Sequence, residues 1–205
     1  MENQEKDDRI SRRKKRVQEI SEQMIKQGYT RHEILLDLKT ANTVSVLLAM
    51  PPMIIYAILF GVFVGWDHFR NIQFLPLMIA FFISLVIHEG IHALFYALAA
   101  EHHFTYIEFG VIWKSLNPYC YCGEVITKGQ YLVALLMPGI ILGGGVGILA
   151  MAIGSATWLA FSLLSFLGAS GDFLVALKFF RFPSEGKDIK ALDHPELPGV
   201  ILFRK

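Results

Sequence analysis

Residues 72–100 read IQFLPLMIAFFISLVIHEGIHALFYALAA, an apolar run interrupted only by His88, Glu89 and His92. About 20 apolar residues, rising about 1.5 Å each along a helix, are enough to cross the hydrocarbon core of a bilayer. The run therefore predicts a membrane-spanning helix. Ionisable side chains are costly inside such a helix and mark functional sites, because lipid offers them no partner.

The composition of the whole chain agrees with a lipid environment. Of 205 residues, 54% are hydrophobic and only 18% are charged, and the mean hydropathy is +0.45. An average soluble domain carries roughly 25% charged residues, so the composition excludes a disordered chain and argues against a soluble globule. The net charge of +1 creates no field that would attract nucleic acid, and we expect no nucleic-acid partner.

Three more stretches are long and apolar enough to span a bilayer, at residues 43–64, 131–153 and 156–180. The predicted fold class is an all-α membrane protein with four transmembrane helices. On the third of these spans Gly139, Gly143 and Gly147 repeat every four residues, which lets a neighbouring helix approach closely. Between the second and third spans, partial alternation over residues 104–109 predicts a short strand or hairpin. Its free edge could pair with an unwound substrate, or the segment could be a loop that caps helix ends.

Charge divides the chain into three parts. We predict a charged amphipathic arm over residues 1–42, a membrane domain over 43–180 and a tail over 181–205. Lys and Arg concentrate in the arm and recur in the tail, which places both termini in the cytoplasm of a multi-pass protein of the cell membrane. The basic run at residues 12–16 is interpreted as a topology signal, although it could also hold anionic lipid headgroups or nucleic acid.

Within the arm, apolar residues at helical spacing predict a helix that ends at Gly28. Thr30 and Glu33 form a capping-box pattern, which predicts a second helix through Leu38. This arm is expected to lie along the membrane surface or beneath the membrane domain.

The sequence His88-Glu89-Gly90-Ile91-His92 has the pattern H-E-x-x-H. On a helix, positions four apart share a face, so both imidazoles can bind one metal ion while Glu89 faces a water bound to it. A pair of histidines that bridges helices by hydrogen bonds is the alternative interpretation.

A catalytic zinc site takes three protein ligands, so a third is required. Phe95 and Leu98 stand where the longer H-E-x-x-H-x-x-G-x-x-H pattern has its Gly and last His. Asp172 is the best candidate, because it is an ionisable residue inside the fourth span and lies at the same estimated depth as His88; a helix-packing hydrogen bond is the alternative role. Other residues that could fold back are Glu101, His102, His103, Glu108 and Glu124.

Cys120 and Cys122 are interpreted as free thiols on the reducing side, although a C-x-C pair can bind metal.

The combination of His88-Glu89-x-x-His92 with Gly171-Asp172 inside a later span resembles the three-helix core of site-2 proteases, and most closely a bacterial group of zincin peptidases of unknown function. The resemblance covers about residues 72–180. It implies that His88, His92 and Asp172 bind Zn²⁺ and that Glu89 activates water. Two features differ from site-2 proteases: Phe173 follows Asp172 where they usually have Gly, and the third span lacks an Asn that could stabilise an oxyanion.

The predicted function is a zinc-dependent intramembrane endopeptidase that acts on membrane-embedded proteins or peptides, with Glu89 as general base. Two alternatives belong to other classes. A small metal or proton transporter would also place His and Asp inside the membrane, although the sequence has no internal repeat. A non-catalytic membrane scaffold could keep a structural metal ion.

Overall fold

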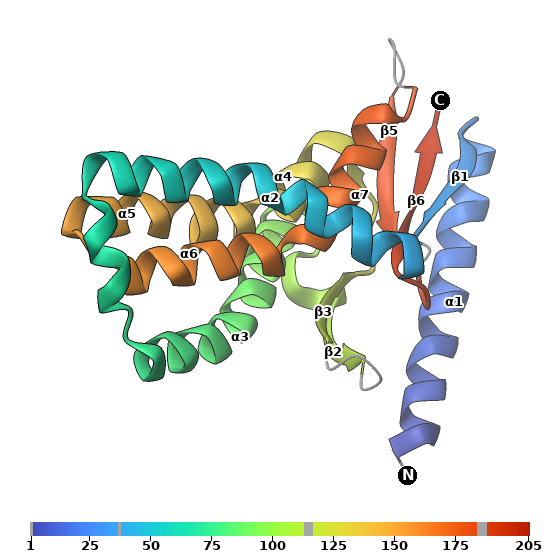
Figure 1. The fold of residues 1–205 in the computed structure, drawn as a ribbon. Helices are drawn as coiled ribbons and strands as arrows, with labels where there is room; N and C mark the ends of the chain where they lie inside the picture. The colour runs from blue at the N-terminus through green and yellow to red at the C-terminus, as the bar shows by residue number, and fades with distance from the viewer. Residues whose placement is uncertain (1, 37, 113–116, 184–187) are drawn as a thin grey trace.

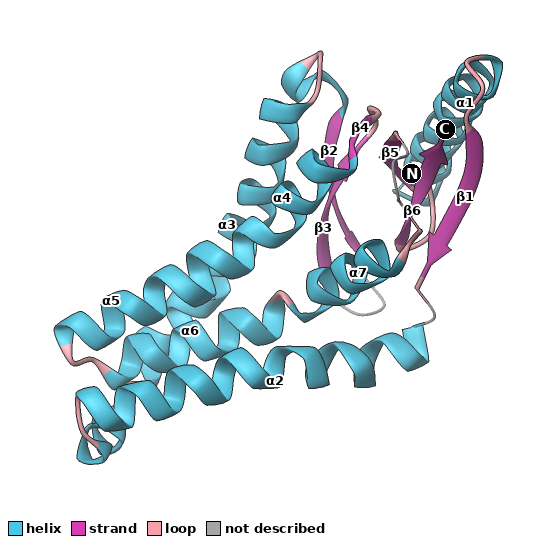
Figure 2. Ribbon diagram, turned by 90° about the horizontal axis from the view of Figure 1, so that it is seen from above, coloured by secondary structure: helices cyan, strands magenta, loops and turns pink. Residues whose placement is uncertain are grey.

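The computed structural model describes residues 2–36, 38–112, 117–183 and 188–205. Apolar helices extend to one side of the molecule, and the strands gather at the other side with the N-terminal helix and both chain ends (Figures 1 and 2). The α-helices are α1 (Glu2–Lys26), α2 (Leu38–Phe63), α3 (Phe74–Ala99), α4 (Lys128–Pro138), α5 (Val146–Ile153), α6 (Ala156–Gly168) and α7 (Ser170–Arg181). The shorter helices are the 3₁₀ turns η1 (Trp66–Asn71) and η2 (His103–Tyr106) and the π-helix η3 (Gly139–Gly145).

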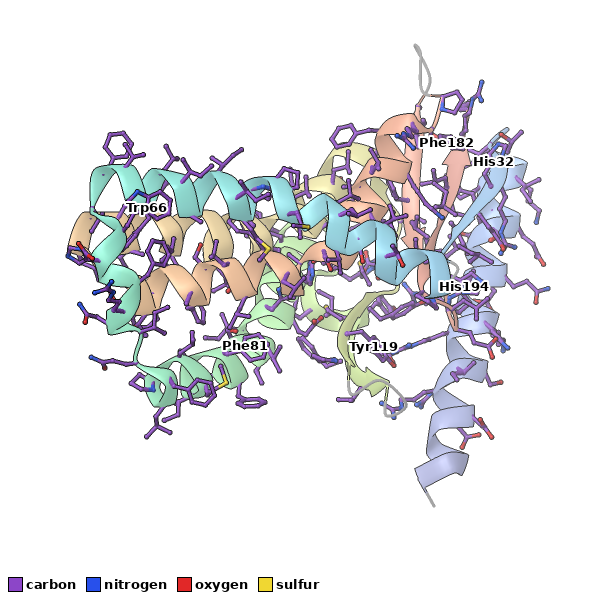
Figure 3. All side chains as sticks on the ribbon, viewed as in Figure 1. His32, Trp66, Phe81, Tyr119, Phe182 and His194 are labelled. Atoms are coloured by element: carbon purple, nitrogen blue, oxygen red, sulfur yellow. The ribbon has the colours of Figure 1, made fainter. Side chains whose placement is uncertain are left out.

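Among the described residues, three continuous helical stretches are long and apolar enough to cross a membrane, namely Thr43–Phe63, Phe74–Ala99 and Lys128–Ile153. The helices α6 and α7 form a fourth span only if they count as one, because they meet at a bend of 48°. Large apolar side chains on these helices stay exposed, for example Phe63, Val86 and Ile148. Figure 3 shows that side chains project from the outer faces of the helices. A membrane protein with mostly α-helical structure accounts for that exposure, since lipid covers such faces.

The glycine repeat lies at helix contacts that leave no room for a Cβ atom. A Cβ on Gly143 would lie 2.7 Å from the ring of Phe166, and one on Gly147 would lie 2.4 Å from the ring of Tyr56. The helix widens to π geometry over η3, and the hydroxyl of Ser162 donates to the carbonyl of Gly143 at 2.6 Å. The predicted close approach along this face is confirmed.

The strands form two sheets. One is a four-stranded antiparallel sheet in the order β1-β6-β5-β4, and the other is the antiparallel pair β2-β3. Their bounds are β1 (Thr30–Leu35), β2 (Ile107–Ile112), β3 (Asn117–Cys122), β4 (Ile126–Thr127), β5 (Ile189–Asp193) and β6 (Gly199–Arg204). The expected hairpin between the second and third spans is present as β2-β3. It begins at Ile107, because residues 103–106 form η2 instead of a strand.

The all-α prediction is incomplete, and the second helix predicted in the arm is wrong. Residues 30–35 form β1, which pairs with β6 in the register Thr30↔Arg204. The Thr30 hydroxyl donates to the carbonyl of Arg204 at 2.9 Å instead of capping a helix. The first helix does end as predicted, with Gly28 in the left-handed conformation at φ 88°. A strand edge offered by the C-terminus thus outweighs a local capping signal.

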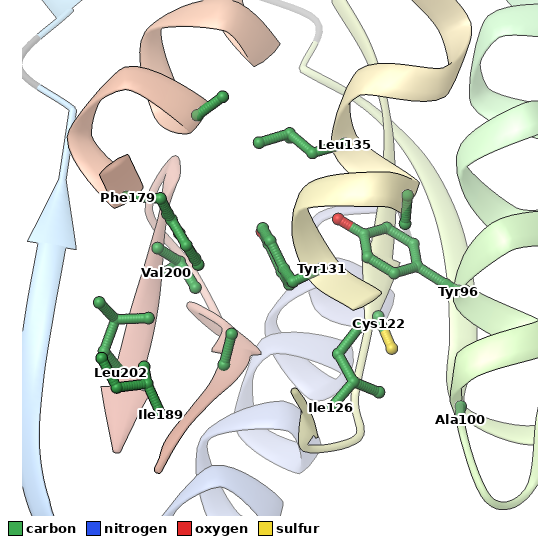
Figure 4. Packing of buried hydrophobic residues seen from close by; sticks show 13 residues of the cluster. Tyr96, Ala100, Cys122, Ile126, Tyr131, Leu135, Phe179, Ile189, Val200 and Leu202 are labelled. Atoms are coloured by element: carbon green, nitrogen blue, oxygen red, sulfur yellow. The ribbon is translucent and has the colours of Figure 1, made fainter. Parts of the chain in front are cut away.

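The largest buried cluster joins the sheet to the helices. Tyr131 of α4 stacks on Phe179 of α7, and Val200 and Leu202 of β6 complete the cluster on the sheet side (Figure 4). Tyr96 of α3 contacts Tyr131 from the other direction. The core therefore fixes α3, α4 and α7 relative to one another, and these are the helices that carry the candidate site.

Candidate metal centre

His88 and His92 lie one turn apart on α3, and their rings meet edge to face. Their Nε2 atoms are 3.2 Å apart. The side chain of His92 is buried at 8% exposure, while that of His88 keeps 15%. The predicted sharing of one helix face by the two imidazoles is therefore observed.

Asp172 reaches this pair from the break between α6 and α7. It lies in the first turn of α7, three residues after Ala169, where the chain turns. Its Oδ2 is 3.2 Å from His88 Nε2 and 3.5 Å from His92 Nε2. The structure thus brings together three side chains that are separated by up to 84 positions in the sequence.

The spacing of these three atoms fits a zinc ion. Two ligands about 2.05 Å from a tetrahedral centre lie about 3.3 Å apart. The three observed separations are 3.2, 3.2 and 3.5 Å. Two imidazoles and a carboxylate form a donor set typical of catalytic zinc, which leaves a fourth position for water. Among the described residues, this is the one group of three or more His, Cys, Asp or Glu side chains arranged to hold a metal ion.

The orientation of the His92 ring is fixed by a hydrogen bond on the side away from His88 and Asp172. Its Nδ1 lies 2.9 Å from the carbonyl oxygen of Ala134 on α4. A carbonyl only accepts, so Nδ1 carries a proton, and Nε2 is the ring nitrogen that faces His88 and Asp172. Such a hydrogen bond to the second ring nitrogen is the usual support of a metal-binding histidine.

Glu89 follows His88 on α3, and Cys120 of β3 is among the groups close enough to act on its carboxylate. Glu89 is partly exposed, whereas His92 is buried. The carboxylate thus lies beside the three-residue cluster without belonging to it.

Comparison with known protein families matches residues 81–186 to a family described as "Putative zincin peptidase". The match covers half of the chain and includes all four residues of the site. The chain belongs to this zincin peptidase family. Zincin peptidases use zinc, so membership implies a zinc cofactor and indicates a zinc metallopeptidase. Comparisons with curated proteins and with solved structures gave no match.

The other candidate ligands of this zincin peptidase have partners elsewhere. Glu124 Oε2 accepts from the backbone N–H groups of Glu101 and His102 at 3.1 and 3.3 Å, which closes the turn after α3. Glu108 pairs with Arg13 of α1, and His103 Nδ1 lies 2.9 Å from the carbonyl of Ala97. None of these residues joins the described cluster.

Cys120 and Cys122 are free thiols, as predicted. Burial raises the pKa of both thiols, that of Cys122 to about 12. Metal binding requires the thiolate, so this environment disfavours a metal site at the C-x-C pair.

One hydrogen bond of the site was missed by sequence reasoning. The carbonyl of Ala134, which His92 contacts, is a backbone group that every residue type carries. Periodicity and motif spacing therefore contain no signal for this contact, which depends on how α4 packs against α3.

Proposed function

We propose that this zincin peptidase is an intramembrane endopeptidase in which His88, His92 and Asp172 bind zinc and Glu89 is the general base. The observation that carries the proposal is the matched spacing of three ligand atoms within 4.8 Å of one another, next to a carboxylate. The site-2-protease-like arrangement of the core belongs to the same proposal.

Each residue has a distinct role in this mechanism. Bound zinc supplies Lewis acidity, which lowers the pKa of a water molecule toward about 7. Glu89 accepts the proton of the attacking water and returns a proton to the leaving amine, so that the peptide bond gains one water molecule. The hydrogen bond to the carbonyl of Ala134 keeps the ring of His92 in its orientation. The carboxylate of Asp172 would balance part of the positive charge of a zinc ion held by the two imidazoles.

The substrate class follows from where the site lies. All three ligands are on helices whose outer faces are apolar, so the substrates we propose are proteins or peptides embedded in the lipid bilayer. Both termini lie at the end of the molecule that carries the sheet and α1, where most Lys and Arg residues occur (Figure 1). By the positive-inside rule we place that end in the cytoplasm and the protein in the cell membrane.

The domain division follows the same reasoning. We assign residues 43–180 to a membrane domain with four spans, and the arm and tail to its cytoplasmic side, where β1 and β6 join them in one sheet.

The decisive test replaces Glu89 in the purified full-length protein in liposomes. Glu89→Gln keeps the shape of the side chain and removes its basicity, so we expect full zinc content and a loss of peptide cleavage of at least about 100-fold. The matched control is Glu101→Gln, which removes an exposed carboxylate in the turn after α3 and should cleave at the wild-type rate.

Each other outcome identifies a different function. Undiminished cleavage by Glu89→Gln would remove Glu89 from the mechanism. Zinc in the wild type without cleavage of any membrane peptide would favour the metal-binding scaffold, and metal or proton flux into liposomes would favour the transporter.

A further inference from the structure

Two arginines of α1, Arg13 and Arg16, hold the β2-β3 hairpin, although α1 lies outside the residues matched by the family. Arg13 is buried at 7% side-chain exposure, and its Nε and Nη2 both donate to Glu108 Oε2, at 3.0 and 2.8 Å. Its guanidinium also lies 4.1 Å from the ring centroid of Tyr121. A buried, doubly hydrogen-bonded and stacked arginine is a specific contact, unlike most surface ion pairs.

Arg16 repeats this contact one turn further along α1. Its Nε donates to the carbonyl of Gly123 at 2.7 Å, just after β3 ends. Its guanidinium stacks on the ring of Tyr106, just before β2 begins, at 3.2 Å from the centroid. The two arginines therefore bind the hairpin at the end where its strands join the rest of the chain.

The hairpin lies between α1 and the metal-binding helix. Successive side chains on a strand point to opposite faces. Tyr119, which is labelled in Figure 3, and Tyr121 point to the face that Arg13 covers, because its guanidinium lies over both rings. The ring of Tyr119 fills the space above Gly110. On the other face, Cys120 and Cys122 pack into the core shared with α3 and α4.

The same strand packs beside the site. Cys122 belongs to the buried cluster that contains Tyr96 of α3 and Ala134 of α4, and the ring of Tyr96 stacks on that of His92. A displacement of β3 would therefore disturb the packing around the site. The contacts of Arg13 and Arg16 hold the hairpin on its opposite face.

We propose that Arg13 and Arg16 are positioning residues of the peptidase: they hold β3 against α3, so that the strand keeps its place beside Glu89 and the metal-binding histidines. The catalytic consequence rests on the proposed function, whereas the clamp itself can be measured without it. The N-terminal helix is then part of the functional enzyme and not a separate arm.

The test uses the thiol of Cys120 as a reporter of hairpin position in the full-length protein, in a Cys122→Ser background. With Arg13→Gln we expect alkylation of Cys120 to be about tenfold faster than in the parent, because the hairpin leaves α3 more often. Arg12→Gln is the matched control, since Arg12 is exposed on the same helix, and it should not change the rate. Arg13→Lys keeps the charge but loses the paired donors, so its rate should lie between those of the parent and Arg13→Gln.

Kinetics then separates positioning from folding. We expect Arg13→Gln to lower kcat about tenfold with unchanged KM and zinc content, and Arg13→Lys to restore part of kcat. Equal alkylation of the Arg13→Gln and Arg12→Gln proteins would overturn the proposal, as would wild-type kcat despite faster alkylation. If the wild type cleaves nothing, the proposed function fails, and alkylation alone decides whether the clamp exists.

Discussion

At the scale of single residues, Asp172 completes the donor set on which the candidate metal centre depends. The two histidines are fixed relative to each other by one helix, and His92 is fixed further by Ala134. Asp172 comes from a different helix and touches both imidazoles. Its carboxylate supplies the negative charge in an otherwise neutral set, so the affinity for zinc should depend on it strongly.

We therefore expect Asp172→Asn to weaken zinc binding by more than about tenfold, because an amide is a poor ligand and carries no charge. Zinc content after dialysis against a graded chelator measures the affinity. Asp67→Asn, at an exposed aspartate in η1, is the control and should match the wild type. Unchanged zinc retention by Asp172→Asn would exclude Asp172 as a ligand.

At the scale of elements, the contact of the α4-η3-α5 span with α2 and α6 depends on missing side chains. A Cβ on Gly147 would lie 2.7 Å from the hydroxyl oxygen of Ser162, in addition to its clash with Tyr56. Packed helices transmit such a clash, because the interior has no free volume to absorb it. The span that carries Ala134 would then shift relative to α3.

Gly147→Ala should accordingly lower the free energy of unfolding by about 1–3 kcal/mol, the usual cost of overpacking. Gly129→Ala places the same methyl group in open space at the start of α4 and should change stability little or raise it slightly. Thermal unfolding in detergent compares the two variants. Equal melting temperatures would show that the helices can separate without cost.

At the scale of the whole molecule, strand β5 in the C-terminal tail anchors the parts that surround the site. Asp193 is buried on β5, and its carboxylate accepts from the backbone N–H of Cys122 at 2.7 Å and from the hydroxyl of Tyr131. One side chain thus ties the tail to both β3 and α4. Burial disfavours its charged form, and although these two hydrogen bonds offset part of that effect, the pKa of Asp193 rises to about 6.

This shift makes stability depend on pH. An unfolded Asp has a pKa of about 3.9, so the raised value contributes stability that is fully present below about pH 4 and is lost as the pH rises through about 6. The unfolding free energy of the wild type, relative to Asp193→Asn, should fall by about 3 kcal/mol between pH 4 and 7. Chemical unfolding at several pH values measures the difference. Parallel curves for the two proteins would contradict the buried carboxylate as its source.

Several features of this protein could be predicted from the amino-acid sequence, because they depend on local spacing. Apolar runs identified the helices that can span a membrane, the four-residue repeat of glycines identified a close helix contact, and Gly28 marked the end of the first helix. The placement of His88 and His92 on one face follows from helical periodicity alone. These features need no distant partner, so neighbouring residues suffice to predict them.

Tertiary structure decided the features that depend on distant partners. Residues 30–35 became a strand because β6, about 170 positions away, offers them a paired edge. The distances from Asp172 to the two histidines depend on how α7 packs against α3, and the contact of His92 with Ala134 uses a backbone group that no motif encodes. The physical reason is that strand pairing and core packing join segments that are far apart in the sequence. The spacing of residues within one segment does not show which other segment it will contact.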